Sequence, residues 1–182
     1  MEKLELMIKP TIGIFTNIGE AHSEGFVNQK QKIREKFKLF KDSEIIIYNA
    51  DQLDIHQNIL EVQHQTNDFN QTTRYKTLSW GIKQEADISI QINIVDTNFT
   101  DVEASYLGSK FLFKIPFTDK ASIENALHCF ATMIYLGISE ALIAKRMRTL
   151  TSVAMRLELK EGINHCFIIN DTYNSDINAL RI

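Results

Sequence analysis

The sequence predicts an α/β fold, in which a parallel sheet flanked by helices carries a small antiparallel β-sheet insertion. The first observation is the order strand, amphipathic helix, buried strand over residues 11–51, which is typical of a βαβ unit. The second is the alternation of apolar and polar residues over 86–96, which predicts a strand with one solvent-facing side. The third is the return of helical periodicity after residue 120.

Length, composition and charge exclude several classes of protein. The 182 residues suit one domain. Hydrophobic residues make up 44% of the chain, enough to form a core, so the sequence is not that of a wholly disordered protein. The net charge of −3 argues against a nucleic-acid partner. No apolar run reaches the roughly 20 residues that span a bilayer, and the N-terminus lacks the pattern of a secretory signal. We expect no membrane association and a cytoplasmic location.

The two cysteines support the same location. Cys129 and Cys166 lie far apart in apolar surroundings, so we expect two buried thiols in a reducing compartment.

The first predicted unit is strand, helix, strand. Residues 11–18 are rich in β-forming residues and bounded by Pro10, which also ends a short preceding helical segment. Residues 27–40 place Ile33, Phe37 and Phe40 on one face of a helix. Residues 43–51 form a nearly unbroken apolar run, as expected for a parallel strand buried on both faces.

The middle of the chain changes to a period of two. Within residues 86–96, the isoleucines at 88, 90, 92 and 94 alternate with polar residues, and residues 102–116 predict a hairpin that turns at Gly108-Ser109. We therefore expect a small antiparallel sheet over residues 76–116, attached to the parallel one.

Helices return in the last third. The residues Ile123, Leu127, Phe130 and Ile134 form an apolar stripe, and Gly137 is placed to end that helix. A short helix should then begin at Ser139, followed by two strands around Gly162.

The segment T-N-I-G-E-A-H-S-E-G-F, residues 16–26, follows the first predicted strand. Ligands of open α/β sheets bind outside the carboxyl ends of the strands. Glu20, His22 and Glu24 could hold a divalent cation there. The alternative is that His22 caps a turn and both carboxylates are solvated, and the short motif alone favours this alternative.

Lys36 lies at the border of the apolar face of the predicted helix. One interpretation is a lysine whose stem covers the core and whose amine reaches water. The other is a desolvated amine with a lowered pKa, which can add carbon dioxide to become a carbamate and then bind a metal ion.

Five segments in order resemble the central domain of the Mur ligases, a family of ATP-dependent amide-bond-forming enzymes of peptidoglycan synthesis. They are the histidine segment at 16–26; E-K-F-K-L-F, with Lys36 fourteen residues after His22; S-I-E-N-A-L-H-C-F-A; M-R-L-E-L; and N-D-T-Y-N-S-D. Each match is short, but together they span nearly the whole chain. The resemblance implies that the parallel sheet is part of a mononucleotide-binding sheet.

The resemblance implies a role for each matching residue. His22 and the carbamate of Lys36 would bind Mg²⁺, and Asn17 would lie where substrate and phosphate meet. ATP would contact Asn125 through its adenine, Arg156 through its phosphates and Asp171 through its ribose. Asn125 and Asp171 could instead serve as local caps, and Arg156 could be a surface cation.

The resemblance also implies domain limits and substrates. Residues 1–170 would be the central ATP-binding domain without its phosphate-binding loop, because no G-x-x-x-x-G-K-[ST] motif occurs, and residues 171–182 would be a hinge and the start of the C-terminal domain. The D-T-Y-N form points to the member that joins D-alanyl-D-alanine to UDP-N-acetylmuramoyl-tripeptide, a monomeric ligase in its full-length form. The S-D-I-N-A-L continuation is similar to forms fused to an alanine racemase. This chain alone should not turn over.

Three alternatives stay open. The first is a sibling enzyme, either another Mur ligase or a folylpolyglutamate synthetase. The second is a metal-dependent hydrolase that uses Glu20, His22 and Glu24. The third is a non-catalytic scaffold that has kept the shape of a ligase.

Overall fold

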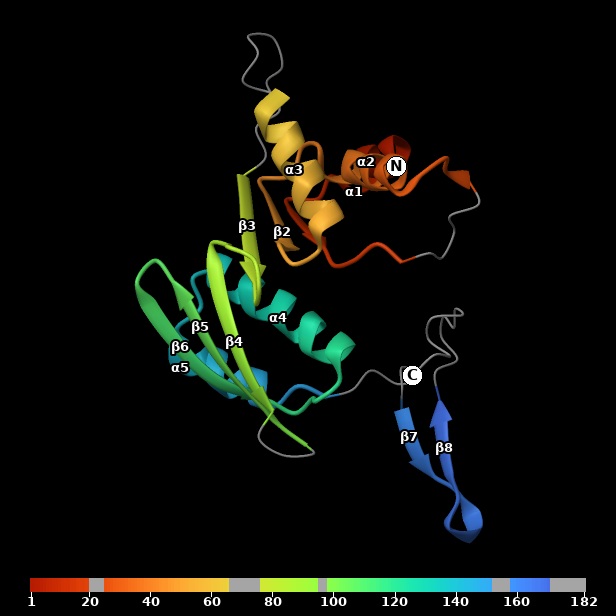
Figure 1. The fold of residues 1–182 in the computed structure, drawn as a ribbon, viewed down its shortest axis with the longest axis vertical. Helices are drawn as coiled ribbons and strands as arrows, with labels where there is room; N and C mark the ends of the chain where they lie inside the picture. The colour runs from red at the N-terminus through yellow and green to blue at the C-terminus, as the bar shows by residue number, and fades with distance from the viewer. Residues whose placement is uncertain (20–24, 66–75, 95–97, 152–157, 171–182) are drawn as a thin grey trace. The chain divides into compact units, whose positions relative to one another are not determined.

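The computed structural model describes residues 1–19, 25–65, 76–94, 98–151 and 158–170. The chain divides into two compact units, Met1–Thr149 and Leu150–Ile182. The first unit holds a sheet and its helices, and the second holds a hairpin (Figure 1). The predicted domain boundary between residues 170 and 171 lies at the edge of the described residues and stays a prediction.

The parallel part of the sheet consists of β1 (Ile12–Phe15), β2 (Ile45–Asn49) and β3 (Lys76–Gly81). β2 pairs in parallel with both neighbours, and every one of its residues is buried, which confirms the predicted central strand. Because parallel strands need a crossover, a helix must follow each of the first two strands. These helices are α2 (Gln29–Phe37) and α3 (Leu53–Gln65).

The antiparallel part consists of β4 (Ile88–Ile94), β5 (Thr100–Tyr106) and β6 (Ser109–Ile115). β4 also pairs with β3, so all six strands form one sheet in the order β1 to β6. The α/β class with an antiparallel insertion is confirmed. The assignment of β3 to the antiparallel part was wrong, because α3, which the sequence analysis did not anticipate, returns the chain parallel to β2.

The remaining helices of the first unit are α1 (Glu2–Ile8), the 3₁₀ turn η2 (Lys38–Phe40), α4 (Lys120–Tyr135) and α5 (Glu140–Arg148). Gly137 has φ +69° and ends α4, as predicted. Ser139 precedes α5 at the predicted cap position, but its side chain makes no capping hydrogen bond.

The two faces of the parallel strands are covered by different helices. On one face Phe15, Ile46 and Tyr48 pack with residues of α2 and α3 in a single buried cluster. Side chains alternate along a strand, so Ile45 and Ile47 point to the other face, where α4 contacts β2 and β3. The carboxyl ends of β1, β2 and β3 therefore open at one edge between these helices.

Asp51 stabilises that edge just beyond β2. Its carboxylate accepts hydrogen bonds from the backbone N–H groups of Ile82, Lys83 and Gln84 at 2.8–2.9 Å. One side chain thus fixes the turn that connects β3 to β4.

We expect Asp51→Ala to lower the free energy of unfolding by about 2 kcal/mol, because three backbone donors lose a charged acceptor at a partly buried position. Urea unfolding measures the change. Asp42→Ala, at a carboxylate 65% exposed, is the control and should change stability by less than about 0.5 kcal/mol. Equal stability of both variants would contradict this role of Asp51.

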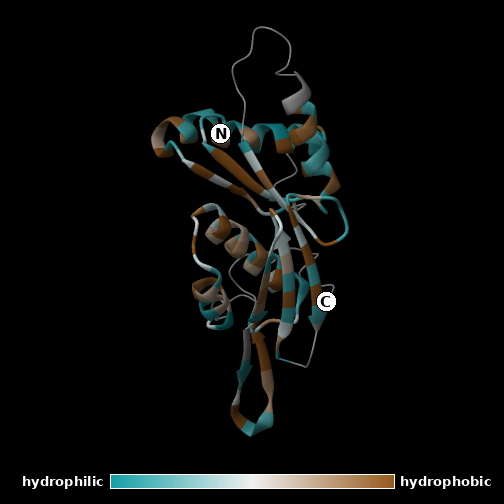
Figure 2. Cartoon of the chain, turned by 90° about the vertical axis from the view of Figure 1, so that its left-hand side faces the viewer, coloured by the Kyte–Doolittle hydropathy of each residue, from teal (hydrophilic) through white to brown (hydrophobic). Residues whose placement is uncertain are grey.

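The second unit is a hairpin of β7 (Glu158–Glu161) and β8 (Phe167–Asn170), joined through the 3₁₀ turn η3 (Ile163–His165). The two predicted strands around Gly162 are confirmed. Figure 2 shows hydrophobic colour along one strand of this hairpin, and Phe167 and Ile169 are 68% and 71% exposed. A hairpin of two strands is at best marginally stable by itself.

One prediction about burial was wrong. Both Cys129 and Cys166 are exposed, because Cys129 lies on the outward side of α4 and Cys166 lies in the hairpin turn. In α1 the side chains of Leu4, Met7 and Ile8 are exposed, and Glu5 is buried instead.

Candidate functional site

The candidate site is a pocket of about 210 Å³ at the carboxyl end of β1. Thr16 and Asn17 directly follow β1, and Lys36 comes from α2. The lining residues are Met1, Ile14, Phe15, Thr16, Asn17, Lys36, Leu39 and Phe40. The structure therefore brings together Asn17 and Lys36, which are nineteen positions apart in the sequence.

The amine of Lys36 is half-buried beside this pocket. Burial lowers the pKa of Lys36, and repulsion from Lys32 lowers it further. Among the described residues the amine has no hydrogen-bond or ion-pair partner. A larger fraction of this amine is therefore neutral than in an ordinary surface lysine, and the neutral form is the one that adds carbon dioxide.

Lys32 was not predicted from the sequence and lies beside the site, although it does not line the pocket. Its side chain is only 4% exposed, and its Nζ donates a 2.7 Å hydrogen bond to the carbonyl oxygen of Gly19. This bond joins α2 to the start of the histidine segment. The signal was the spacing, because Lys32 and Lys36 are four residues apart and so lie on the same side of α2.

We expect Lys32→Met to raise the pKa of Lys36 toward its ordinary value, because the methionine keeps the apolar stem and removes the neighbouring charge. An NMR titration of the lysine side-chain nitrogen and carbon signals measures this. Lys30→Met, at an exposed amine paired with Glu61, is the control and should leave the pKa of Lys36 unchanged. An identical Lys36 titration in wild type and Lys32→Met would contradict the expected coupling.

His128 of α4 connects the opposite face of the sheet to the same strand end. The ring of His128 is buried, and its Nδ1 accepts a 3.1 Å hydrogen bond from Trp80 Nε1. The proton of the neutral imidazole therefore lies on Nε2, which faces the backbone of Thr16 without a hydrogen bond of good geometry. Burial lowers the pKa of His128 to about 4, so the ring is neutral at physiological pH.

The other predicted site residues are not brought into the pocket by the described structure. Asn125 is exposed on α4, one turn before His128, and lies outside the pocket lining. His22, Arg156 and Asp171 lie outside the described residues, as do Glu20 and Glu24. Their predicted roles stay predictions.

The donor atoms at the pocket are compatible with Mg²⁺ only if Lys36 is modified. Thr16 and Asn17 offer hydroxyl and amide oxygens, the type of ligand that Mg²⁺ prefers. An ammonium would repel the ion, whereas a carbamate would supply two further oxygens. The described residues contain no group of three or more His, Cys, Asp or Glu side chains that could hold a metal.

The sheet order, the crossover helices and the polar strand ends define an open α/β domain, the class of fold whose members bind ligands at the carboxyl edge of a parallel sheet. The chain belongs to the Mur ligase family. The profile of the Mur ligase middle domain matches residues 1–133.

Relatives with assigned names are similar over most of the chain. The UDP-N-acetylmuramoyl-tripeptide--D-alanyl-D-alanine ligase of Bacillus subtilis (strain 168) is 26% identical over 191 residues, covering 100% of this chain and 37% of the relative. The UDP-N-acetylmuramate--L-alanine ligase of Francisella philomiragia is 26% identical over 176 residues, covering 92% of this chain and 37% of the relative. This chain thus spans little more than a third of the length of these relatives.

Solved structures share the fold. MurF from Acinetobacter baumannii superposes with a TM-score of 0.74 at 18% identity, over 99% of this chain and 38% of that one. MurF ligase from Thermotoga maritima in complex with ADP superposes with a TM-score of 0.72 at 21% identity, over 97% of this chain and 39% of that one.

Proposed function

We propose that this chain is the central part of an ATP-dependent ligase that joins D-alanyl-D-alanine to UDP-N-acetylmuramoyl-tripeptide. The observation that carries the proposal is the shared pocket of Asn17 and Lys36 at the carboxyl end of β1, in a chain of the Mur ligase family. The name of the Bacillus subtilis relative and the D-T-Y-N segment support the particular substrates.

Each site residue has a proposed part in this reaction. Lys36, as its carbamate, and His22 would hold Mg²⁺, and Asn17 would orient the substrate carboxylate beside the terminal phosphate. Asn125, Arg156 and Asp171 would hold ATP through its adenine, phosphates and ribose. When bound, Mg²⁺ supplies positive charge that reduces the repulsion between the two anionic reactants.

The proposed reaction is activation of a carboxylate. The terminal carboxylate of the tripeptide attacks the γ-phosphorus of ATP, which gives an acyl phosphate and ADP. The amine of D-alanyl-D-alanine then attacks the acyl carbon, and phosphate leaves. Positioning and electrostatic stabilisation provide most of the catalysis in phosphoryl transfer, so rigid placement of Asn17 and Lys36 is the contribution of this chain.

The test uses the complete protein that carries this chain, because the 182 residues contain no phosphate-binding loop motif. The protein is incubated with ATP, Mg²⁺, UDP-N-acetylmuramoyl-tripeptide and D-alanyl-D-alanine, and product and phosphate are measured together. We expect one phosphate for each amide bond formed. Parallel reactions offer the precursors with L-alanine or D-glutamate, the amino acids named for other relatives.

The outcomes distinguish the alternatives. Product with L-alanine or D-glutamate instead would identify a sibling ligase. Substrate hydrolysis that needs metal but no ATP would support the hydrolase with Glu20, His22 and Glu24, and absence of all turnover would support a scaffold. The ligase proposal includes a cytoplasmic location and a monomeric full-length form. Within the described residues, no helix is long and apolar enough to cross a membrane.

A further inference from the structure

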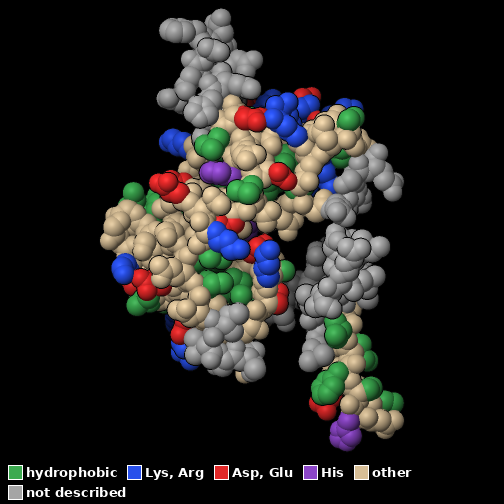
Figure 3. All heavy atoms as spheres, viewed as in Figure 1, with side chains coloured by type: hydrophobic (Ala, Val, Ile, Leu, Met, Phe, Trp, Pro, Cys, Tyr) green, Lys and Arg blue, Asp and Glu red, His purple; other side chains and the backbone are tan. Residues whose placement is uncertain are grey.

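The imidazole of His128 is a buried titratable group that the proposed reaction does not use. Figure 3 shows histidine side chains at the surface of the molecule, whereas His128 is only 3% exposed. Both nitrogens of its ring must therefore find hydrogen-bond partners inside the protein, because a buried polar atom without a partner destabilises the fold.

One nitrogen of the ring has a well-defined partner. Nδ1 accepts the 3.1 Å hydrogen bond from Trp80 Nε1, and the two rings meet edge to face with their centroids 5.0 Å apart. Trp80 is itself fully buried in β3, and an indole nitrogen can only donate. The bond therefore requires an unprotonated Nδ1, which places the single proton of the neutral ring on Nε2.

The other nitrogen faces the strand end of the candidate site. Nε2 is buried without a hydrogen bond of good geometry among the described residues, and it faces the backbone carbonyl of Thr16. The pairing of β1 with β2 ends at Phe15, so Thr16 is the first residue beyond the ladder. Thr16 and Asn17 both line the pocket. The unpaired donor thus lies where the hydrogen bonds of the sheet stop holding the chain.

A hydrogen bond at this carbonyl would act on Asn17. The carbonyl group of Thr16 and the N–H group of Asn17 belong to one planar peptide unit. Holding the carbonyl limits the rotation of that unit, and so fixes the direction in which Asn17 leaves the strand. A small rotation of the unit completes the bond and removes the cost of a buried donor without a partner.

We propose that His128 is a positioning residue of the candidate site, which fixes the Thr16–Asn17 peptide unit through a hydrogen bond from Nε2 while Trp80 fixes the ring. The inference rests on the proposed function, in which Asn17 orients the substrate carboxylate. His128 touches no reactant, because its ring is buried. Since α4 also carries Asn125, the proposed contact of adenine, the ring holds two proposed parts of the site at a set separation.

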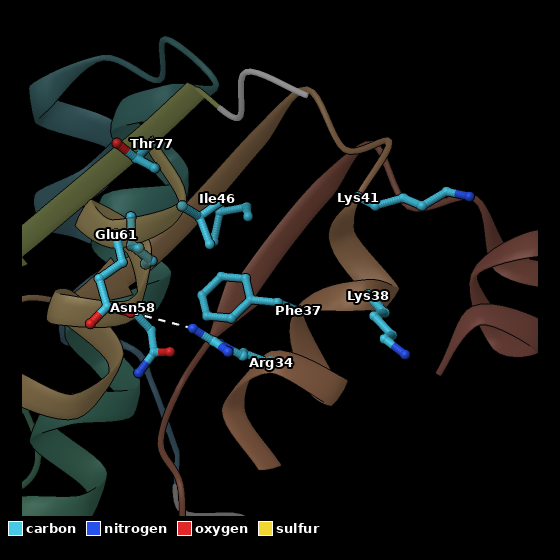
Figure 4. Close-up of a pocket in the computed structure, with 10 residues that line it drawn as sticks. Arg34, Phe37, Lys38, Lys41, Ile46, Asn58, Glu61 and Thr77 are labelled. Carbon is cyan, nitrogen blue, oxygen red and sulfur yellow. Dashed lines mark ion pairs between the residues drawn. The ribbon is translucent and has the colours of Figure 1, made fainter. Parts of the chain in front are cut away.

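A buried amide elsewhere in the first unit supplies a matched control. Asn58 is 6% exposed, and its Oδ1 is likewise buried without a hydrogen-bond partner among the described residues. Figure 4 shows Asn58 in the pocket between α2 and α3, which shares no lining residue with the pocket at the end of β1. Asn58→Leu therefore replaces a buried polar side chain, as His128→Leu does, but away from Thr16.

NMR on the 182-residue chain tests the hydrogen bond without turnover. Long-range ¹H–¹⁵N spectra of the wild type should show the Nε2–H tautomer of His128. The carbonyl ¹³C signal of Thr16 should move upfield in His128→Leu and stay unchanged in Asn58→Leu. His128→Gln has no ring but keeps an acceptor for Trp80 and a donor for Thr16, so its Thr16 signal should stay close to that of the wild type.

The consequence for the reaction is measured in the complete protein that carries this chain. His128→Leu should reduce kcat of the proposed ligase reaction at least about tenfold and leave the KM for ATP within about twofold, because a misplaced Asn17 affects the chemical step and not nucleotide binding. His128→Gln should restore most of kcat, and Asn58→Leu should keep it.

Three results would overturn the proposal. They are an Nδ1–H tautomer in the wild type, which needs no variant to fold; a Thr16 carbonyl signal that is the same in wild type and His128→Leu; and an equal loss of kcat in His128→Leu and Asn58→Leu. A wild type without ligase activity would refute the proposed function alone, since the NMR spectra decide the hydrogen bond independently.

Discussion

Lys36→Ala in the complete protein that carries this chain should reduce the proposed amide-bond synthesis by at least about 10³-fold, because the variant cannot form the carbamate that would hold Mg²⁺. Lys36→Glu should keep part of the activity, since a carboxylate replaces the negative charge of the carbamate. The initial rate of phosphate release, measured with saturating ATP and dipeptide, compares the three proteins.

A matched control separates the carbamate from a general loss of positive charge. Lys38 is two residues away on the same segment, is 44% exposed, and forms ion pairs with Glu2 and Glu35. Those carboxylates raise the pKa of Lys38, so its amine stays protonated and does not add carbon dioxide. Lys38→Ala should keep nearly full activity.

Carbamate formation can also be measured without turnover. The 182-residue chain, incubated with ¹³C-labelled bicarbonate, should show a carbamate carbon signal that Lys36→Ala lacks and Lys38→Ala retains. Full activity of Lys36→Ala, together with an unchanged carbon spectrum, would refute the role of this lysine.

The sequence was most informative where periodicity and burial agree. The run at Ile45–Asn49 is apolar at nearly every position, and the strand is buried on both faces. Ile88 and Ile90 alternate with polar residues, and both are buried on one face of β4. Strand pairing could not be predicted in this way, because the apolar pattern of one strand does not specify which strand pairs with it. The pairing of β3 followed from α3, whose residues Ile55, Ile59 and Val62 have helical spacing that was overlooked in the prediction.

Two of the candidate site residues taken from short motifs lie together, and their roles stay predictions. Asn17 and Lys36 were selected from the sequence, and both line the β1 pocket. Lys32 and His128 were missed because their importance depends on tertiary contacts. Lys32 is significant through its bond to Gly19, and His128 through its contact with Trp80, 48 positions earlier in the chain.

His128 predicts that acid destabilises the fold within a defined pH range. In the unfolded chain its pKa is about 6.5, whereas burial lowers the folded pKa to about 4. Between these values the unfolded state binds a proton that the folded state excludes. The contribution of His128 to the free energy of unfolding is therefore fully present above pH 6.5 and is lost as the pH falls to about 4, a change of about 3 kcal/mol.

Urea unfolding of the 182-residue chain at a series of pH values between these limits measures this loss. His128→Gln should reduce the slope of the free energy of unfolding against pH, because glutamine does not titrate. Its side-chain carbonyl can still accept the hydrogen bond from Trp80 Nε1. His165→Gln, at an exposed position of the hairpin, should leave the slope unchanged. His128 joins α4 to β3 and faces Thr16. Protonation of its ring should therefore also loosen the strand end that carries Asn17. A slope that is the same in wild type and His128→Gln would mean that other groups cause the acid sensitivity.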